Sequence, residues 1–196
     1  MPSPAVWKFS IRSMLQRFRR NRRGSAAVEF ALVAPIFFAL LFAIMETALM
    51  FFASQVLETV TQNSARAVLT GQAQAQGGSL AACQVTSGVT SACTQATFHT
   101  YVCSQIPALF FDCNSLYVDV SSYSTFSAVT LPSHIDAAGF FDTSMGYSAG
   151  NAGDIVVVRT FYQWPLYVTG LGYNISNLAG NKRLLVATAA FKNEPF

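Results

Sequence analysis

One stretch of the sequence decides the fold: residues Ala26–Ala53 are AAVEFALVAPIFFALLFAIMETALMFFA. Its apolar residues are interrupted only by Glu29, Pro35, Glu46 and Thr47. A helix of about 20 apolar residues crosses the roughly 30 Å hydrocarbon core of a bilayer. The stretch is therefore long enough to insert into the lipid bilayer, and it predicts a membrane helix near the N-terminus.

Charges differ in sign on the two sides of this stretch. Seven cations and no acid precede Gly24, whereas the remainder carries 5 basic and 9 acidic side chains, and the formal net charge of the whole chain is +3. Cations beside an apolar helix favour the cytoplasmic side of the membrane. We therefore expect a cytoplasmic N-terminus, a single span of the cytoplasmic (inner) membrane and a periplasmic C-terminal domain. The acidic remainder offers no basic patch for nucleic acid.

Three kinds of N-terminal segment could produce this pattern: a cleaved secretory signal, a plain signal anchor, or a pilin-type leader followed by a retained helix. A secretory signal has an apolar core of about 7 to 15 residues before a small-residue cleavage site, and this stretch is longer. A plain anchor explains the length but not Glu29, because a carboxylate within a membrane helix costs about 2 to 3 kcal/mol and normally needs a partner. Glu29 is therefore the informative residue.

The residues around Glu29 resemble a known family. Arg19–Phe30 is RRNRRGSAAVEF, and a basic leader ending in glycine, with glutamate as the fifth residue of the mature chain, is the pattern of type IV pilins and pseudopilins. Glutamate followed by an aromatic residue, here Phe30, is similar to the tight-adherence (Tad, or Flp) branch. Residues 24–72 resemble the TadE-like pseudopilins in particular, including the second acid, Glu46, and the Ala-Arg element that ends at Arg66.

The resemblance implies that a prepilin peptidase, an aspartyl protease of the membrane, cleaves between Gly24 and Ser25. It also implies that other pilins or pseudopilins and Tad assembly proteins are partners. Cleavage would create an ammonium group at Ser25, and the i, i+4 spacing places that group and Glu29 on one helix face. In pilins this glutamate is thought to pair with the terminal amine of a neighbouring subunit. The alternative is that Glu29 is solvated at the cytoplasmic interface and has no role.

Two further residues of the stretch have open interpretations. Pro35 removes a helical hydrogen bond and can kink the axis, or it is simply tolerated. Glu46 follows Glu29 by about 25 Å of helix, near the outer membrane boundary. It marks either a contact with another pilus component or a side chain that reaches solvent at the interface.

The helix is expected to continue beyond the membrane, from about Ala26 to Leu69. A stripe of apolar and small residues recurs there at spacings of three and four: Leu57, Val60, Thr61, Ser64, Ala65 and Val68. It packs either on the chain's own sheet, which we favour, or on the helix of a neighbouring subunit. Gly71 is expected to end the helix, and residues 71–79 form a flexible polar linker.

Residues 80–196 form the expected periplasmic domain. The sequence predicts a short helix at Thr97–Phe110 and strands at Leu116–Val120, Asp154–Tyr162 and Leu184–Phe191, with a weaker strand at Thr125–Leu131. The predicted fold class is α+β and pilin-like, with a long N-terminal transmembrane helix packed on a small antiparallel sheet. The domains are then a cleaved leader (1–24), the membrane and extended helix (25–70), the linker (71–79) and this domain (80–196).

Four cysteines lie in this domain: Cys83, Cys93, Cys103 and Cys113. They contain no closely spaced pair of the kind that zinc sites use, so no metal is expected. An even number of cysteines in an exported domain favours two disulfides. The uniform spacing of ten residues does not choose among the three pairings, and we favour the pairing of sequence neighbours.

No catalytic site or cofactor is expected. His99 and His134 have Ser, Thr or Asp neighbours in the sequence. The sequence contains no nucleophile elbow, metal box or phosphate loop, however. The leading hypothesis is a minor pilin or pseudopilin that takes part in assembly of a tight-adherence pilus after prepilin-peptidase processing. The alternative is an unprocessed single-pass anchor that carries a periplasmic binding domain, and a secreted enzyme is a third possibility.

Overall fold

A computed structural model describes residues 24–74, 80, 83, 92–106, 111–168 and 174–196. The predicted leader before Gly24 and residues 75–79 of the predicted linker lie outside the described residues. Contacts within the chain divide it into two units, Met1–Ile44 and Met45–Phe196. The two units are described separately below.

The described part of the first unit consists of Gly24 and the beginning of one helix. This helix, α2, runs from Ser25 to Leu69, which confirms the predicted helix to within one residue. Pro35 lies inside α2 without ending it. An 18-residue window of α2 has a mean hydropathy of 2.4 and no residue buried in the protein, so α2 is long and apolar enough to cross a membrane.

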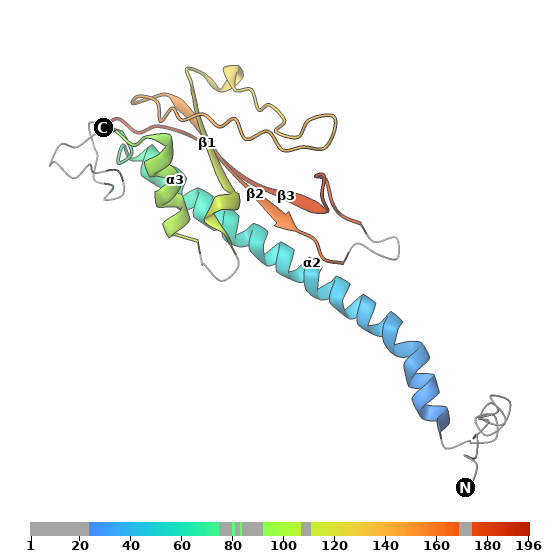
Figure 1. Cartoon of the computed structure of the whole chain (residues 1–196). Coiled ribbons are helices and arrows are strands. Elements are labelled where there is room, and N and C mark those ends of the chain that lie inside the picture. Colours follow the sequence, from blue (N-terminus) through green and yellow to red (C-terminus); the bar gives the residue numbers. More distant parts are fainter. Residues whose placement is uncertain (1–23, 75–79, 81–82, 84–91, 107–110, 169–173) are drawn as a thin grey trace, which may run out of the picture. The chain divides into compact units, whose positions relative to one another are not determined.

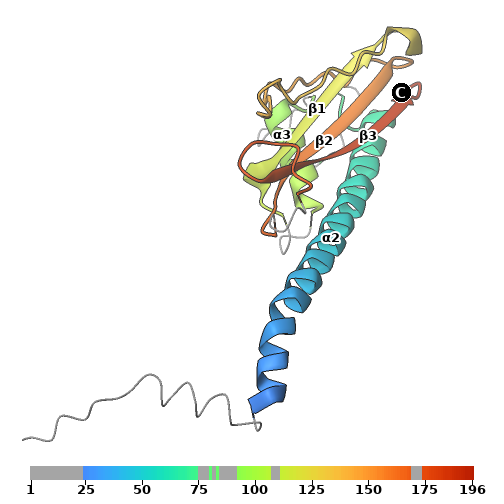
Figure 2. The ribbon, with the colours of Figure 1, turned by 90° about the vertical axis from the view of Figure 1, so that its right-hand side faces the viewer.

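The second unit is built on a three-stranded antiparallel sheet (Figures 1 and 2). Its strands are β1 (Leu116–Tyr123), β2 (Ile155–Pro165) and β3 (Lys182–Lys192), with β2 in the centre. The three stronger strand predictions are confirmed. Both faces of β2 are buried for nearly its whole length, which explains why its sequence is almost continuously apolar rather than alternating.

Helices cover one face of the sheet. The C-terminal part of α2 supplies the predicted stripe, of which Leu57, Thr61, Ser64 and Val68 are at most 1% exposed, and the Thr61 hydroxyl hydrogen-bonds the Thr160 hydroxyl of β2. The stripe therefore packs on the chain's own sheet, as favoured from the sequence. A second helix, α3 (Gln95–Ser104), lies beside β1 (Figure 2) and buries Phe98 and Val102.

A long connection between β1 and β2 covers the opposite face. Its Ile135, Phe141 and Met145 pack against a small core that contains Phe161 and Leu184. This connection is therefore the second covering layer of the sheet.

The weaker strand prediction at Thr125–Leu131 is wrong, because the chain forms a short 3₁₀ turn at Phe126–Ala128 instead. The outer edge of β1 is partly occupied by a different segment: Val120 N–H donates to the Gly146 carbonyl, and Ser148 N–H donates to the Val120 carbonyl. Although Val129 and Leu131 alternate as in a strand, residues 125–131 pair with no strand of the sheet.

Both disulfides join sequence neighbours, Cys83 with Cys93 and Cys103 with Cys113. This confirms the favoured pairing. The second bridge ties α3 to the turn that leads into β1. Thr94 caps the start of α3, where its hydroxyl accepts from Thr97 N–H.

The end of α2 is a fixed turn. Gly71 adopts a φ of 76°, which glycine tolerates best, and its N–H donates to the Val68 carbonyl. Gln74 is only 8% exposed, and its amide donates to the carbonyls of Val68 and Ala149. The flexible linker predicted from Gly71 onward is therefore wrong for Gly71–Gln74, because the buried amide fixes this turn against the domain.

Candidate membrane helix and assembly site

The bond predicted for peptidase cleavage lies where α2 begins. Gly24 is exposed and Ser25 is the first residue of α2. Gly24 does not have a positive φ, so backbone conformation does not require glycine here. A Cβ added to it would meet no atom of the structure within 4 Å. The feature that glycine supplies at this bond is therefore open space, which favours close approach by another molecule.

Glu29 and Phe30 follow in the first turns of α2, and both are exposed. Glu29 lies four residues after Ser25, so the two residues share one face of the helix. Phe30 is 67% exposed. Both side chains therefore lie on the exposed surface of the helix in this unit.

The described helix up to Ile44 exposes large apolar side chains around its circumference. They comprise Val28, Phe30, Leu32, Val33, Ile36, Phe37, Phe38, Leu40, Leu41, Phe42 and Ile44. A helix that is apolar all round is typical of a membrane span or of the core of a large protein. No residue of the most apolar window is buried within the protein, which favours the membrane span.

The structure gives the second acid, Glu46, a partner that the sequence did not indicate. Its carboxylate accepts hydrogen bonds from the backbone N–H groups of Tyr167 and Val168, immediately after β2. The N–H of Val168 lies 3.1 Å from Oε2 and 3.3 Å from Oε1. Glu46 is only 8% exposed. A buried carboxylate is costly unless it is hydrogen-bonded, and here two N–H groups satisfy it.

Glu46 therefore joins α2 to the end of β2 within the second unit. Neither interpretation offered by the sequence describes this arrangement, because the side chain neither extends to solvent nor is left available to another protein. Its role in this structure is to hold the start of the β2–β3 connection against the helix. We call the contact of Glu46 with Tyr167 and Val168 the Glu46 clasp.

Sequence reasoning also missed a buried polar cluster under the β1–β2 connection. Asp119 of β1 lies opposite Arg159 of β2 in the strand register, and the two form an ion pair of 2.8 Å. The Arg159 guanidinium also contacts the ring of His134 at 2.9 Å and donates to the Pro132 carbonyl. The signal was present, because one acid and one base each interrupt an apolar strand and each requires a partner.

The two histidines considered for catalysis are held apart in structural positions. His99 Nε2 hydrogen-bonds the Leu116 carbonyl, whereas His134 stacks edge-on against Phe161 beside Arg159. Among the described residues, no group of three or more His, Cys, Asp or Glu side chains could hold a metal ion.

Comparison with known proteins gives one match. Residues 24–66 match the family model described as TadE-like protein. No curated protein and no solved structure gives a significant match. The matched segment starts at the glycine of the predicted cleavage bond and contains Glu29, Glu46 and most of α2. Over residues 24–66, this chain is therefore similar to the TadE-like proteins.

Proposed function

We propose that the chain is a minor pilin or pseudopilin of a tight-adherence pilus, cleaved by a prepilin peptidase between Gly24 and Ser25. The observation that carries the proposal is the coincidence of three boundaries. The basic run ends at Arg23, the TadE-like match begins at Gly24, and α2 begins at Ser25. A peptidase that recognises a cationic leader would find its bond at the exposed start of the apolar helix.

The chemistry of the first turn supports an assembly role after cleavage. The new ammonium group at Ser25 and the carboxylate of Glu29 would lie one helical turn apart. An isolated charge is expensive in lipid, so each group favours an opposite charge. If the partner is on a neighbouring subunit, the pair also sets the axial register of assembly.

Processing is tested by producing the full chain in bacterial membranes together with a Tad prepilin peptidase or with its catalytically inactive form. Intact-mass measurement and N-terminal sequencing identify the product. We expect a chain that starts at Ser25 with the active peptidase and an intact leader with the inactive one. Gly24→Ala should slow cleavage, because the added methyl group occupies the open space at the bond. An intact leader in the presence of active peptidase would instead support the unprocessed, membrane-anchored binding protein.

Assembly is tested separately with Glu29→Gln, which keeps the size of the side chain and removes its charge. Glu58→Gln is the matched control, because Glu58 is an exposed acid on the same helix. We expect both variants to insert and to be processed, whereas only Glu29→Gln reduces the number of pili in cells that carry the complete Tad system. Normal piliation with Glu29→Gln would exclude the charge pair.

A further inference from the structure

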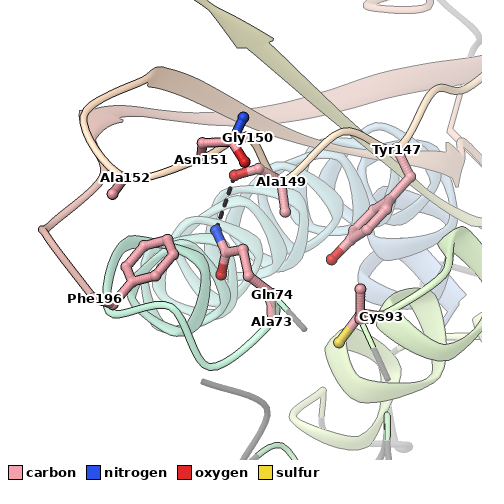
Figure 3. Close-up of a pocket in the computed structure, with 10 residues that line it drawn as sticks. Ala73, Gln74, Cys93, Tyr147, Ala149, Gly150, Asn151, Ala152 and Phe196 are labelled. Carbon is pink, nitrogen blue, oxygen red and sulfur yellow. Dashed lines mark hydrogen bonds between the residues drawn. The ribbon is translucent and has the colours of Figure 1, made fainter. Parts of the chain in front are cut away.

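A cavity of about 600 Å³ lies in the second unit, beyond the C-terminal end of α2 (Figure 3). It is formed where the turn after α2, the segment before α3, the end of the β1–β2 connection and the last residue meet. Its described lining residues are Ala73, Gln74, Ala92, Cys93, Tyr147, Ala149, Gly150, Asn151, Ala152 and Phe196. Cavities of about 300 to 1,000 Å³ are typical of small-ligand sites.

Buried polar atoms without partners lie at and beside this cavity. Within the described structure, Gln74 Oε1, Asn193 Oδ1 and the Tyr147 hydroxyl have no hydrogen-bond partner. Gln74 and Asn193 are 8% and 3% exposed. Leaving such a group unsatisfied costs about 1 to 3 kcal/mol, so this end of the domain holds polar groups that would gain from a partner.

The orientation of the two amides follows from their other contacts. The Gln74 nitrogen donates to the carbonyls of Val68 and Ala149 at 3.1 and 2.9 Å, and the Asn193 nitrogen donates to those of Ala149 and Asn151 at 2.9 and 3.0 Å. Because both nitrogens are committed to acceptors, both oxygens remain as acceptors. These two amide oxygens therefore require hydrogen-bond donors.

The walls of the cavity add two aromatic rings. Figure 3 shows Phe196 and Tyr147 on opposite sides of Gln74. Phe196 lies against the turn at Gly71, where an added Cβ would come within 2.5 to 2.9 Å of the Cγ, Cδ1 and Cβ atoms of Phe196. Tyr147 packs against Phe98 of α3 with ring centroids 5.3 Å apart. Packing on these neighbours positions both rings.

The described lining residues include no charged side chain. A charged ligand would lose its hydration in such a site without gaining an opposite charge, so a neutral ligand is favoured. Hydroxyl groups satisfy the remaining acceptors, and the rings provide apolar surfaces for C–H groups. We propose that this cavity binds a neutral, polyhydroxylated ligand of the saccharide class.

In this site the buried side-chain oxygens of Gln74 and Tyr147 turn toward the ligand, so that one ligand hydroxyl donates to Gln74 Oε1 and a second one exchanges a hydrogen bond with the Tyr147 hydroxyl. The Phe196 ring packs on the C–H face of the sugar. The proposal goes beyond the assembly function and does not depend on cleavage at Gly24. Failure of one therefore leaves the other intact.

The test is saturation-transfer NMR on the full chain in phosphatidylcholine nanodiscs, because maltoside detergents would supply glucose units of their own. The probes are glucose, galactose, mannose and N-acetylglucosamine at millimolar concentration, with sodium acetate and ethylammonium chloride as charged comparisons. We expect transfer to at least one sugar and none to the charged probes. Absence of transfer to all four sugars, or transfer to a charged probe alone, would overturn the proposal.

Two variants locate the binding. Tyr147→Phe removes only a hydroxyl that makes no hydrogen bond in the described structure, so the domain should stay folded while affinity falls about tenfold, the equivalent of one hydrogen bond. Ala152→Trp places a large ring at an exposed position of the lining and should abolish binding. Tyr117→Phe, on the opposite face of the sheet, is the matched control and should bind as the wild type does. Equal binding by Tyr147→Phe and the wild type would refute the site.

Discussion

Disruption of the Glu46 clasp should produce a change in hydrogen exchange that is confined to two backbone amides. Replacing Glu46 with alanine leaves the N–H groups of Tyr167 and Val168 without their acceptor. Each hydrogen bond to a charged group contributes about 1.5 to 3 kcal/mol. Because the N–H of Val168 is shared between both carboxylate oxygens, we take the low end for each, a total loss of about 3 kcal/mol. The same free energy corresponds to a factor of about 100 in the local opening equilibrium.

The assay is amide hydrogen exchange on the full chain in nanodiscs. In Glu46→Ala, exchange at Tyr167 and Val168 should accelerate about 100-fold, whereas amides in the centre of β2 should keep their protection, because local opening need not involve the core strands. Glu46→Gln keeps one acceptor oxygen and should give a smaller change, about tenfold.

Glu58→Ala is the matched control, since it removes an exposed acid from the same helix. It should leave both amides unchanged. If Glu46→Ala protects Tyr167 and Val168 as well as the wild type does, the clasp contributes nothing and the reasoning fails. If Glu58→Ala accelerates them equally, the effect is one of general charge rather than of this contact.

Three further predictions concern the second unit. Replacing Cys103 and Cys113 together with serine should lower the free energy of unfolding by about 2 to 3 kcal/mol, the loop-closure term for a short loop, measured by urea denaturation with tryptophan fluorescence. Asp119→Ala leaves Arg159 buried without its acid and should lower the free energy of unfolding by at least about 3 kcal/mol in the same assay. The double variant Asp119→Leu, Arg159→Met should recover most of that loss. Equal losses in the single and double variants would show that the two residues are not coupled. Burial raises the pKa of the Tyr147 hydroxyl above its ordinary value of 10.0. The folded state therefore binds this proton more tightly than the unfolded state, and the free energy of unfolding should fall as pH rises above about 10. Tyr147→Phe should flatten this part of the stability profile, and an unchanged profile would contradict the raised pKa of Tyr147.

The elements that the sequence predicted well are those with a strong local pattern. The apolar run and the three-and-four spacing of Leu57 to Val68 placed α2 and its buried face, because both are properties of consecutive residues. The strands at Leu116, Ile155 and Lys182 were found for the same reason, through runs rich in β-branched residues. Their boundaries moved by only a few residues in the structure.

The elements that it missed depend on contacts between distant residues. Glu46 and Tyr167 are 121 positions apart, and nothing local to either residue indicates the other. The sequence indicated that Asp119 and Arg159 each need a partner, but only the register of β1 and β2 shows that they are partners of each other. The strand predicted at Thr125–Leu131 failed likewise, because its pattern was suitable but Gly146 and Ser148 occupy the edge of β1 that it needed.

The burial of Glu46 also follows from its position relative to the point in the second unit where the exposed side chains of α2 change from mainly apolar to polar. Exposed large apolar side chains continue to Phe52, Thr47 is the one exposed polar residue among residues 45–52, and the next is Gln55. A membrane surface would therefore meet the helix near Ala53. Glu46 lies seven residues before that point, about 10 Å along the axis toward the apolar side. A carboxylate at that depth cannot rely on water, so the protein must supply its donors, which the clasp does. Tyr167, 84% exposed beside it, is the kind of side chain that favours the interface between lipid and water. The clasp thus holds the end of β2 against α2, and the same contact explains why an acid is tolerated in the apolar stretch.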